Sequence, residues 1–232
     1  MSTSPLRAVP SEIAPRGVER ALASQRRKYE DEIERLVDAT FRVMRARDTA
    51  EPTVSEILSE AKLSTSSFYR HFPTKDDLFL TLLERAHSMT RIHIEERIGS
   101  LPDPVDQIEE WVRAMFDLLR TDDLVTANRP FLLAHPRLLE QFPDEISSGF
   151  DALVTPLAGA IREARYQAGL QPGDAALDGR LVLHQVFGML IDAAALHAPP
   201  SPVVIDGVVS YTLRAVLAPA PPARGSTESE SA

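Results

Sequence analysis

Hydroxyl, aromatic and basic side chains are concentrated in one short stretch of the sequence, between residues 53 and 75. They are Thr53, Ser64, Thr65, Ser66, Ser67, Tyr69, Arg70, His71 and Lys75. Side chains of these types donate hydrogen bonds to phosphate oxygens and to base edges, and the basic ones also pair with phosphate charges. If the fold presents them on one surface, the chemistry that they support is binding to double-stranded DNA.

Two short helices are needed to present this surface. The first is predicted to begin after Thr53, which can form a capping box with Glu56. Apolar side chains then recur at helical spacing, at Val54, Ile57, Leu58 and Ala61. The helix is predicted to break at Lys62 and Leu63, and Ser64 can cap the second helix.

The second helix has an inner and an outer side. Phe68 and Phe72 lie four residues apart and are predicted to face the core. Thr65, Ser66 and Tyr69 point away from it. Two helices joined by so short a turn predict a helix-turn-helix unit, whose second helix lies in the major groove with its first residues on base edges.

The sequence LSTSSFYRHFPTKDDLF, residues 63–79, resembles the recognition helix and following segment of the TetR family of transcriptional regulators. The resemblance covers residues 30–85 and includes an amphipathic first helix that would brace the other two, with Ile33, Leu36, Val37, Thr40, Phe41 and Met44. One departure is Lys62, where the family usually has glycine. A residue with a side chain must adopt a less favoured backbone conformation in this turn.

The resemblance implies a role for each polar side chain. Thr65 and Ser66 would contact base edges. Phosphate contacts would come from Thr53, Ser67, Tyr69, His71 and Lys75, while Arg70 would reach a base or a phosphate and Ser64 would cap the helix. The alternative is that these hydroxyls only cap helices and that Tyr69 packs on the first helix.

The net charge of -9 is unusual for a DNA-binding protein, but the acidity is unevenly distributed. Residues 1–100 contain 16 basic and 16 acidic side chains, and residues 101–232 contain 9 and 18. Phosphate binding needs a basic surface locally, which Arg26, Arg27, Lys28, Arg70 and Lys75 can supply. The absence of cysteine excludes disulfides and fits the cytoplasm, where we expect the protein to act.

The predicted fold class is all-α, because no alternating run is long enough to indicate a strand. We expect a helix-turn-helix DNA-binding domain over residues 25–73, a connecting helix over residues 74–98 and a helical ligand-binding and dimerisation domain over residues 99–218. Residues 1–24 and 219–232 are predicted to be a disordered arm and tail. The arm is either solvated or in contact with DNA.

Within the second domain, helices are predicted over residues 105–120, 145–168, 174–198 and 203–217, with a broken segment through Phe131 and His135. Residues 181–196 are apolar on nearly every face, so a partner must cover one side. We expect a homodimer built from the last two helices, bound to a near-palindromic operator. The same stretch contains His184, Gln185 and Asp192 and falls short of the ~20 apolar residues that span a membrane.

A ligand pocket is expected in the second domain, because similar proteins use this domain to sense small molecules. Candidate lining residues are large apolar side chains with two histidines among them: Trp111, Met115, Phe116, Phe131, His135, Phe150, His184 and Phe187. Each could equally belong to an ordinary core. An apolar effector that binds one conformer would release a repressor from its operator by population shift.

Two other functions remain open from the sequence. An effector-independent architectural or constitutive DNA-binding protein would differ only in lacking release by a ligand. A helical metal enzyme would need two Glu-x-x-His pairs, and only Glu84 and His87 form one. His87, His93 and Glu96 could form a weak metal site, but no catalytic motif is present. We therefore expect neither an enzyme nor a resident cofactor.

Overall fold

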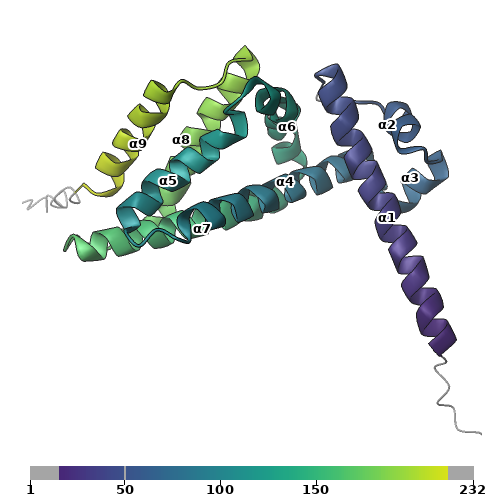
Figure 1. Cartoon of the computed structure of the whole chain (residues 1–232), viewed down its shortest axis with the longest axis horizontal. Coiled ribbons are helices and arrows are strands. Elements are labelled where there is room, and N and C mark those ends of the chain that lie inside the picture. The colour runs from purple at the N-terminus through teal and green to yellow at the C-terminus, as the bar shows by residue number, and fades with distance from the viewer. Residues whose placement is uncertain (1–15, 50, 219–232) are drawn as a thin grey trace, which may run out of the picture.

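The computed structural model describes residues 16–49 and 51–218, and every regular element in those two ranges is a helix. The predicted all-α fold class is confirmed. Figure 1 shows two parts, a small N-terminal unit and a larger helical domain, with one long helix running from the first into the second.

The N-terminal unit consists of α1 (Arg16–Arg47), α2 (Val54–Ala61) and α3 (Thr65–His71). Figure 1 shows α2 and α3 together on one side of α1. Their shared core contains Leu36, Met44, Ile57, Phe68 and Phe72, all nearly or fully buried. The helical spacing of these side chains therefore determines how the three helices pack.

The first helix begins earlier in the chain than predicted. Residues 16–24, expected to be disordered, form the first turns of α1, and residues 1–15 lie outside the described part of the chain. Val18 and Leu22 are 52% and 60% exposed, so burial does not stabilise these turns. They extend a helix that is already nucleated by its packed half, and each added residue then costs little.

The connecting helix is α4 (Lys75–Ile98), and its bounds agree with the predicted ones to within a residue. Thr74 caps it, accepting a hydrogen bond from the amide of Asp77 at 3.2 Å. Gly99 follows its last turn, as expected. Leu78, Phe79 and Leu82 are completely buried against the N-terminal unit, so the start of α4 is fixed to that unit.

The second domain contains α5 (Pro104–Phe116), a short 3₁₀ helix η1 (Asp117–Leu119), α6 (Asp122–Gln141), α7 (Pro143–Gln167), α8 (Ala175–Leu196) and α9 (Pro202–Val216). α8 packs on α6 and α7, and α9 packs mainly on α5. α8 is long and apolar enough to cross a membrane by length and composition alone, with a mean hydropathy of 1.3. In this fold one face of α8 is buried in the core, with Val182, Leu183, Val186 and Leu190.

The predicted broken segment through Phe131 and His135 is instead one continuous helix, α6, with Pro130 and Pro136 inside it. A proline within a helix costs about 3 kcal/mol. Burial of Phe131 and Leu138, at about 1.5–3 kcal/mol per side chain, offsets much of this cost. The two prolines therefore did not break the helix, because tertiary packing outweighs their local cost.

The two parts of the molecule are joined along α6. Phe131 belongs to the core of the N-terminal unit, and its ring lies 4.7 Å from that of Phe41 on α1. Arg129 donates to the carboxylate of Asp48 at 2.9 Å and to the carbonyl of Ala194 at 2.9 Å. The end of α1 is therefore tied through α6 to the end of α8.

Candidate nucleic-acid interface

The first helix of the motif has the predicted cap. The hydroxyl of Thr53 accepts from the amide of Glu56 at 3.2 Å, and the Glu56 carboxylate accepts from the amide of Thr53 at 2.7 Å. The expected capping box is confirmed. α2 ends at Lys62, whose φ of 53° and ψ of 46° lie in the left-handed region. For a residue with a side chain this conformation costs roughly 1–2 kcal/mol, as the sequence led us to expect.

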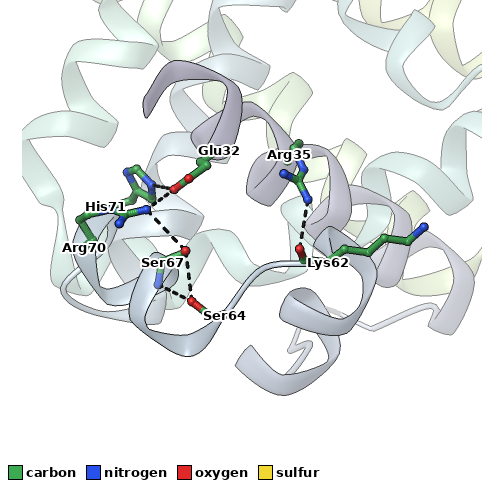
Figure 2. A network of polar contacts seen from close by, with 7 residues as sticks. All are labelled: Glu32, Arg35, Lys62, Ser64, Ser67, Arg70 and His71. Atoms are coloured by element: carbon green, nitrogen blue, oxygen red, sulfur yellow. Dashed lines mark hydrogen bonds and ion pairs between the residues drawn. The ribbon is translucent and has the colours of Figure 1, made fainter. Parts of the chain in front are cut away.

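Arg35 of α1 supports this turn. Its Nη2 donates to the carbonyl of Ala61 at 2.6 Å and to that of Lys62 at 3.1 Å, and Figure 2 shows the contact with Lys62. The guanidinium thereby supplies donors to carbonyls that the end of α2 leaves without helical partners, and its charge faces the negative end of that helix. This contact helps to explain how a lysine is accommodated where the family usually has glycine.

The second helix presents the predicted faces. Ser64 caps α3, accepting from the amide of Ser67 at 3.1 Å. Phe68 is completely buried and Phe72 is 5% exposed, whereas Tyr69 is 56% exposed. Thr65 and Ser66, in the first turn, are also exposed. The inward and outward sides of α3 are therefore those that the phenylalanine spacing predicted.

Glu32 on α1 organises the last turn of α3, as Figure 2 shows. The Nε2 of His71 donates to the Glu32 carboxylate at 2.8 Å, and Arg70 donates to the same oxygen. The hydrogen bond from His71 lowers the pKa of Glu32 below its ordinary value; burial opposes this shift, and Arg70 adds to it. An ionised carboxylate therefore holds α3 against α1.

The structure corrects the predicted role of His71. Its side chain has no exposed surface and faces Glu32 instead of the exterior, because a buried carboxylate attracts the nearest donor. Arg70 keeps 54% of its side-chain surface exposed despite its contact with Glu32. Lys75 is half-buried, with its ammonium group 5.7 Å from the ring centre of Phe79.

The contacts of Glu32 and Arg35, which hold α3 and the turn before it, were not predicted from the sequence. Both lie on α1, three residues apart, and both contact the motif. The only sequence feature that could have predicted their contacts is that both are charged and lie next to the apolar residues Ile33 and Leu36. That pattern also describes an ordinary solvated helix edge, so it does not reveal a partner 26 or 38 residues away.

The eight residues predicted to line a ligand pocket fall into three groups. Trp111, Met115 and Phe116 are at most 1% exposed in the main core, where the indole of Trp111 donates to the carbonyl of Leu153 at 3.0 Å. Phe131 belongs to the N-terminal core. These four side chains were expected to line a cavity, and in the structure they pack in the hydrophobic cores instead.

The other four come together with a fifth residue in a histidine–phenylalanine cluster, which consists of His87, His135, Phe150, His184 and Phe187. Neighbouring ring centres are 4.6 to 5.8 Å apart, and the rings of His135 and Phe150 are stacked. Burial, together with a smaller contribution from a neighbouring histidine, lowers the pKa of His87 and of His135 to about 4. Both imidazoles are therefore neutral at pH 7.

The suggested metal site does not form. Within residues 16–49 and 51–218, no three His, Asp or Glu side chains are placed to hold a metal ion. His87 turns toward Gly149, where an added Cβ would lie 2.2 Å from its Nδ1. His93 instead contacts the carboxylate of Asp117 at 3.2 Å.

Comparisons with known proteins agree with this geometry. Residues 36–82 match the family model of bacterial regulatory proteins of the tetR family. The HTH-type transcriptional regulator YerO of Bacillus subtilis (strain 168) is 28% identical over 109 residues, which are 41% of this chain and 37% of YerO. The matched region thus spans well under half of that relative.

Solved structures share the fold over most of the chain. A TetR transcription regulator from Haloarcula marismortui has a TM-score of 0.66 at 20% identity, covering 80% of this chain and 98% of its own. FadR of Thermus thermophilus, solved with lauroyl-CoA, has a TM-score of 0.59 at 22% identity, with 83% and 99% covered. The helix-turn-helix, its family-model match and the common fold lead to one assignment. The N-terminal unit of the chain is that of the TetR family of bacterial regulatory proteins, and the rest of the described chain shares the fold of solved TetR-family structures.

Proposed function

We propose that this protein is a DNA-binding transcriptional regulator that represses by occupying a near-palindromic operator as a homodimer and is released by an apolar small molecule. The observation that carries the proposal is the outer face of α3. Thr65, Ser66 and Tyr69 are exposed there, on a helix that is capped at its start and fixed by Phe68 behind. A short helix held this rigidly, with polar groups outward, suits a major groove.

Each exposed side chain has a proposed role. Thr65 and Ser66 contact base edges, and their short side chains limit how many base pairs they distinguish. Tyr69, Lys75 and the start of α2 at Thr53 contact phosphates. Arg70 reaches a phosphate with its exposed guanidinium while Glu32 orients it. Ser67 is half-buried and contributes through the first turn of α3.

The dimer is proposed to form through α8 and α9. Both helices expose apolar side chains that no other described residue covers: Leu177, Leu181, Leu196, Val203, Val204 and Tyr211, at 42–81% exposure. Gly188 and Gly207 lie on the same two helices, and a Cβ added at either would meet no atom within 4 Å. Glycines on an open helix face allow a partner helix to approach closely. Twofold symmetry would then place two copies of α3 about one DNA turn, ~34 Å, apart or further.

Release by a ligand is supported by the fold and by two proteins that share it. FadR of Thermus thermophilus was solved with lauroyl-CoA and FadR of Bacillus subtilis with stearoyl-CoA. In this chain α4 is fixed to the DNA-binding unit at one end and packs on α5 and α7 at the other. A ligand that moves α4 would change the separation of the two recognition helices.

The proposal is tested by selecting bound fragments from the source genome with the purified protein and then measuring operator affinity by fluorescence anisotropy. Lys75→Ala is expected to weaken binding and to reduce the slope of log K against log salt by roughly one, the value of a single lysine–phosphate pair. Tyr69→Ala is expected to weaken binding with little change in that slope, because tyrosine carries no charge. Arg162→Ala, on the exposed face of α7, is the matched control and should change neither.

Operator affinity that is unchanged in both Lys75→Ala and Tyr69→Ala would contradict the assigned surface. A selected operator without twofold symmetry would contradict the dimer. Operator affinity that no compound bound by the second domain alters would favour the effector-independent alternative.

A further inference from the structure

A cavity of about 700 Å³ lies where the DNA-binding unit meets the second domain. Its walls come from α1, from the middle of α4, from η1 and from the first half of α6. None of the eight residues that the sequence suggested for a pocket lines it. The volume is within the range of small-molecule sites, about 300–1,000 Å³.

The interior of this junction cavity is mainly apolar. Phe41 comes from α1, Ala86 and Met89 from α4, Leu118 from η1, and Leu124 and Ala127 from α6. Met89 is 61% exposed, an unusual fraction for a methionine between two packed units. The apolar part of a bound ligand would cover this exposed apolar surface and remove it from water.

The rim on the α4 and η1 side carries an excess of donors over acceptors. The carboxylate of Asp117 is shared by Arg97 at 2.9 Å, by His93 at 3.2 Å and by Arg120 at 3.8 Å. Arg97 also contacts Glu110. Arg120 makes no other ion pair within the described residues, and its side chain is 68% exposed. Its guanidinium is therefore available to a second anionic group, with a geometry suited to a carboxylate or a sulfonate.

The cavity also lies where a bound molecule would change the contacts of the DNA-binding unit. Asp38 and Phe41 of α1 form one wall, and Arg85 of α4 reaches across to Asp38 at 3.5 Å. Phe41 in turn contacts Phe131 of α6. A molecule inserted between these helices would have to displace or tighten the contacts that orient α1 against α4 and α6.

We infer that this junction cavity is an effector site for a small amphipathic anion, whose apolar body lies against Phe41, Met89 and Leu124 and whose single acidic group pairs with Arg120. The inference deepens the proposed function and rests on it only for the consequence at the operator. Binding itself depends on the cavity alone.

The test uses two fluorescent probes with the same ring system. 8-Anilinonaphthalene-1-sulfonate carries one acidic group, and N-phenyl-1-naphthylamine carries none. Titration of the full chain without DNA is expected to show saturable binding of one probe molecule per subunit. Ala127→Phe fills the cavity from α6 and should abolish binding of both probes. Arg120→Gln should weaken the sulfonate probe about 10-fold, the value of one charge-assisted hydrogen bond, and leave the neutral probe within about 2-fold.

Matched controls separate this site from others. Ala152→Phe alters a different groove, between α4 and α7, and should leave both probes unaffected. Arg162→Gln removes an exposed arginine that does not line the cavity. Ala86→Phe fills the same cavity from α4, and it replaces Ala127→Phe if that variant does not fold by circular dichroism.

Probe binding that survives the filling variants, or that Ala152→Phe abolishes, overturns the inference. An equal loss of both probes in Arg120→Gln overturns the anionic part of it. With DNA present, the sulfonate probe should lower operator affinity of the unaltered protein and not of Ala127→Phe; unaltered affinity in both overturns the effector role. Failure of the protein to bind any operator would instead contradict the proposed function while leaving the probe result standing.

Discussion

At the scale of single residues, charged side chains on α1 determine how α3 is held. Glu32 fixes the last turn of α3 through Arg70 and His71, and Arg35 fixes the turn before it. Neither contact is visible in the sequence, where the two residues look like a solvated helix edge. The start of α3 and its inner and outer faces were predictable, because a capping serine and phenylalanines four apart are local signals.

Replacing Glu32 should lower stability in a pH-dependent way. The native pKa of Glu32 is below its ordinary value of 4.5, so its contribution is fully present above that pH and is lost as the pH falls through the native value. Glu32→Gln should therefore cost about 1 kcal/mol at pH 7 and less near pH 3.5. Urea unfolding at both pH values measures this difference. Glu34→Gln, on the exposed side of the same helix, should show no such cost; an equal cost in the two variants would rule out the network.

The left-handed turn residue offers a second residue-scale prediction. Lys62→Gly removes roughly 1–2 kcal/mol of backbone strain but adds about 0.5–1 kcal/mol of chain entropy to the unfolded state. The net expectation is a stabilisation of about 0.5 kcal/mol, read as a higher urea midpoint. Lys28→Gly, in the regular part of α1, should destabilise by about 1 kcal/mol. A loss of stability in Lys62→Gly would mean that its side chain contributes more than the turn costs.

At the scale of helices, the sequence predicted most elements and missed those decided by tertiary packing. Starts of α2, α3, α4 and α8 carry capping side chains, so their positions were predictable. α6 was not, because two prolines suggested a break that burial of Phe131 and Leu138 overcomes. The pocket residues were missed for a similar reason: an aromatic on an apolar helix looks the same whether it fills a core or lines a cavity.

The two C-terminal helices lead to a prediction about assembly. Leu181 is 59% exposed on α8, within the face assigned to the dimer. Leu181→Arg would place a charge in that interface, and we expect the protein to become monomeric at micromolar concentration by light scattering. Leu139→Arg is the matched control, because Leu139 is an exposed leucine on α6, outside the two helices assigned to the dimer. A monomer before any substitution, or a dimer in Leu181→Arg, would contradict the assigned face.

At the scale of the whole molecule, the buried imidazoles make stability depend on mild acid. The native pKa of His87 and of His135 is about 4, below the ordinary 6.5, so below pH 6.5 protons bind preferentially to the unfolded chain. Stability is therefore greatest above that pH and falls as the pH decreases. Each histidine should cost about 2 kcal/mol between pH 7 and pH 5.

The measurement is urea unfolding at pH 7 and pH 5 for the unaltered protein and for His135→Phe, which keeps an aromatic ring beside Phe150. The variant should lose less stability over this interval. Carboxylates such as Glu32 titrate mainly below it, so they do not obscure the comparison. An identical pH dependence in both proteins would show that His135 does not stay neutral when folded.

Arg129 has a consequence for how the molecule responds as a unit. One planar guanidinium holds the carboxylate where α1 ends and the carbonyl where α8 ends, and it is only 18% exposed. A lysine has a single ammonium and cannot bridge both acceptors in the same fork. Arg129 would thus couple dimerisation through α8 to DNA binding by the N-terminal unit. A displacement of either helix end would change the position of the other through this one side chain, and no helix between them would have to unfold.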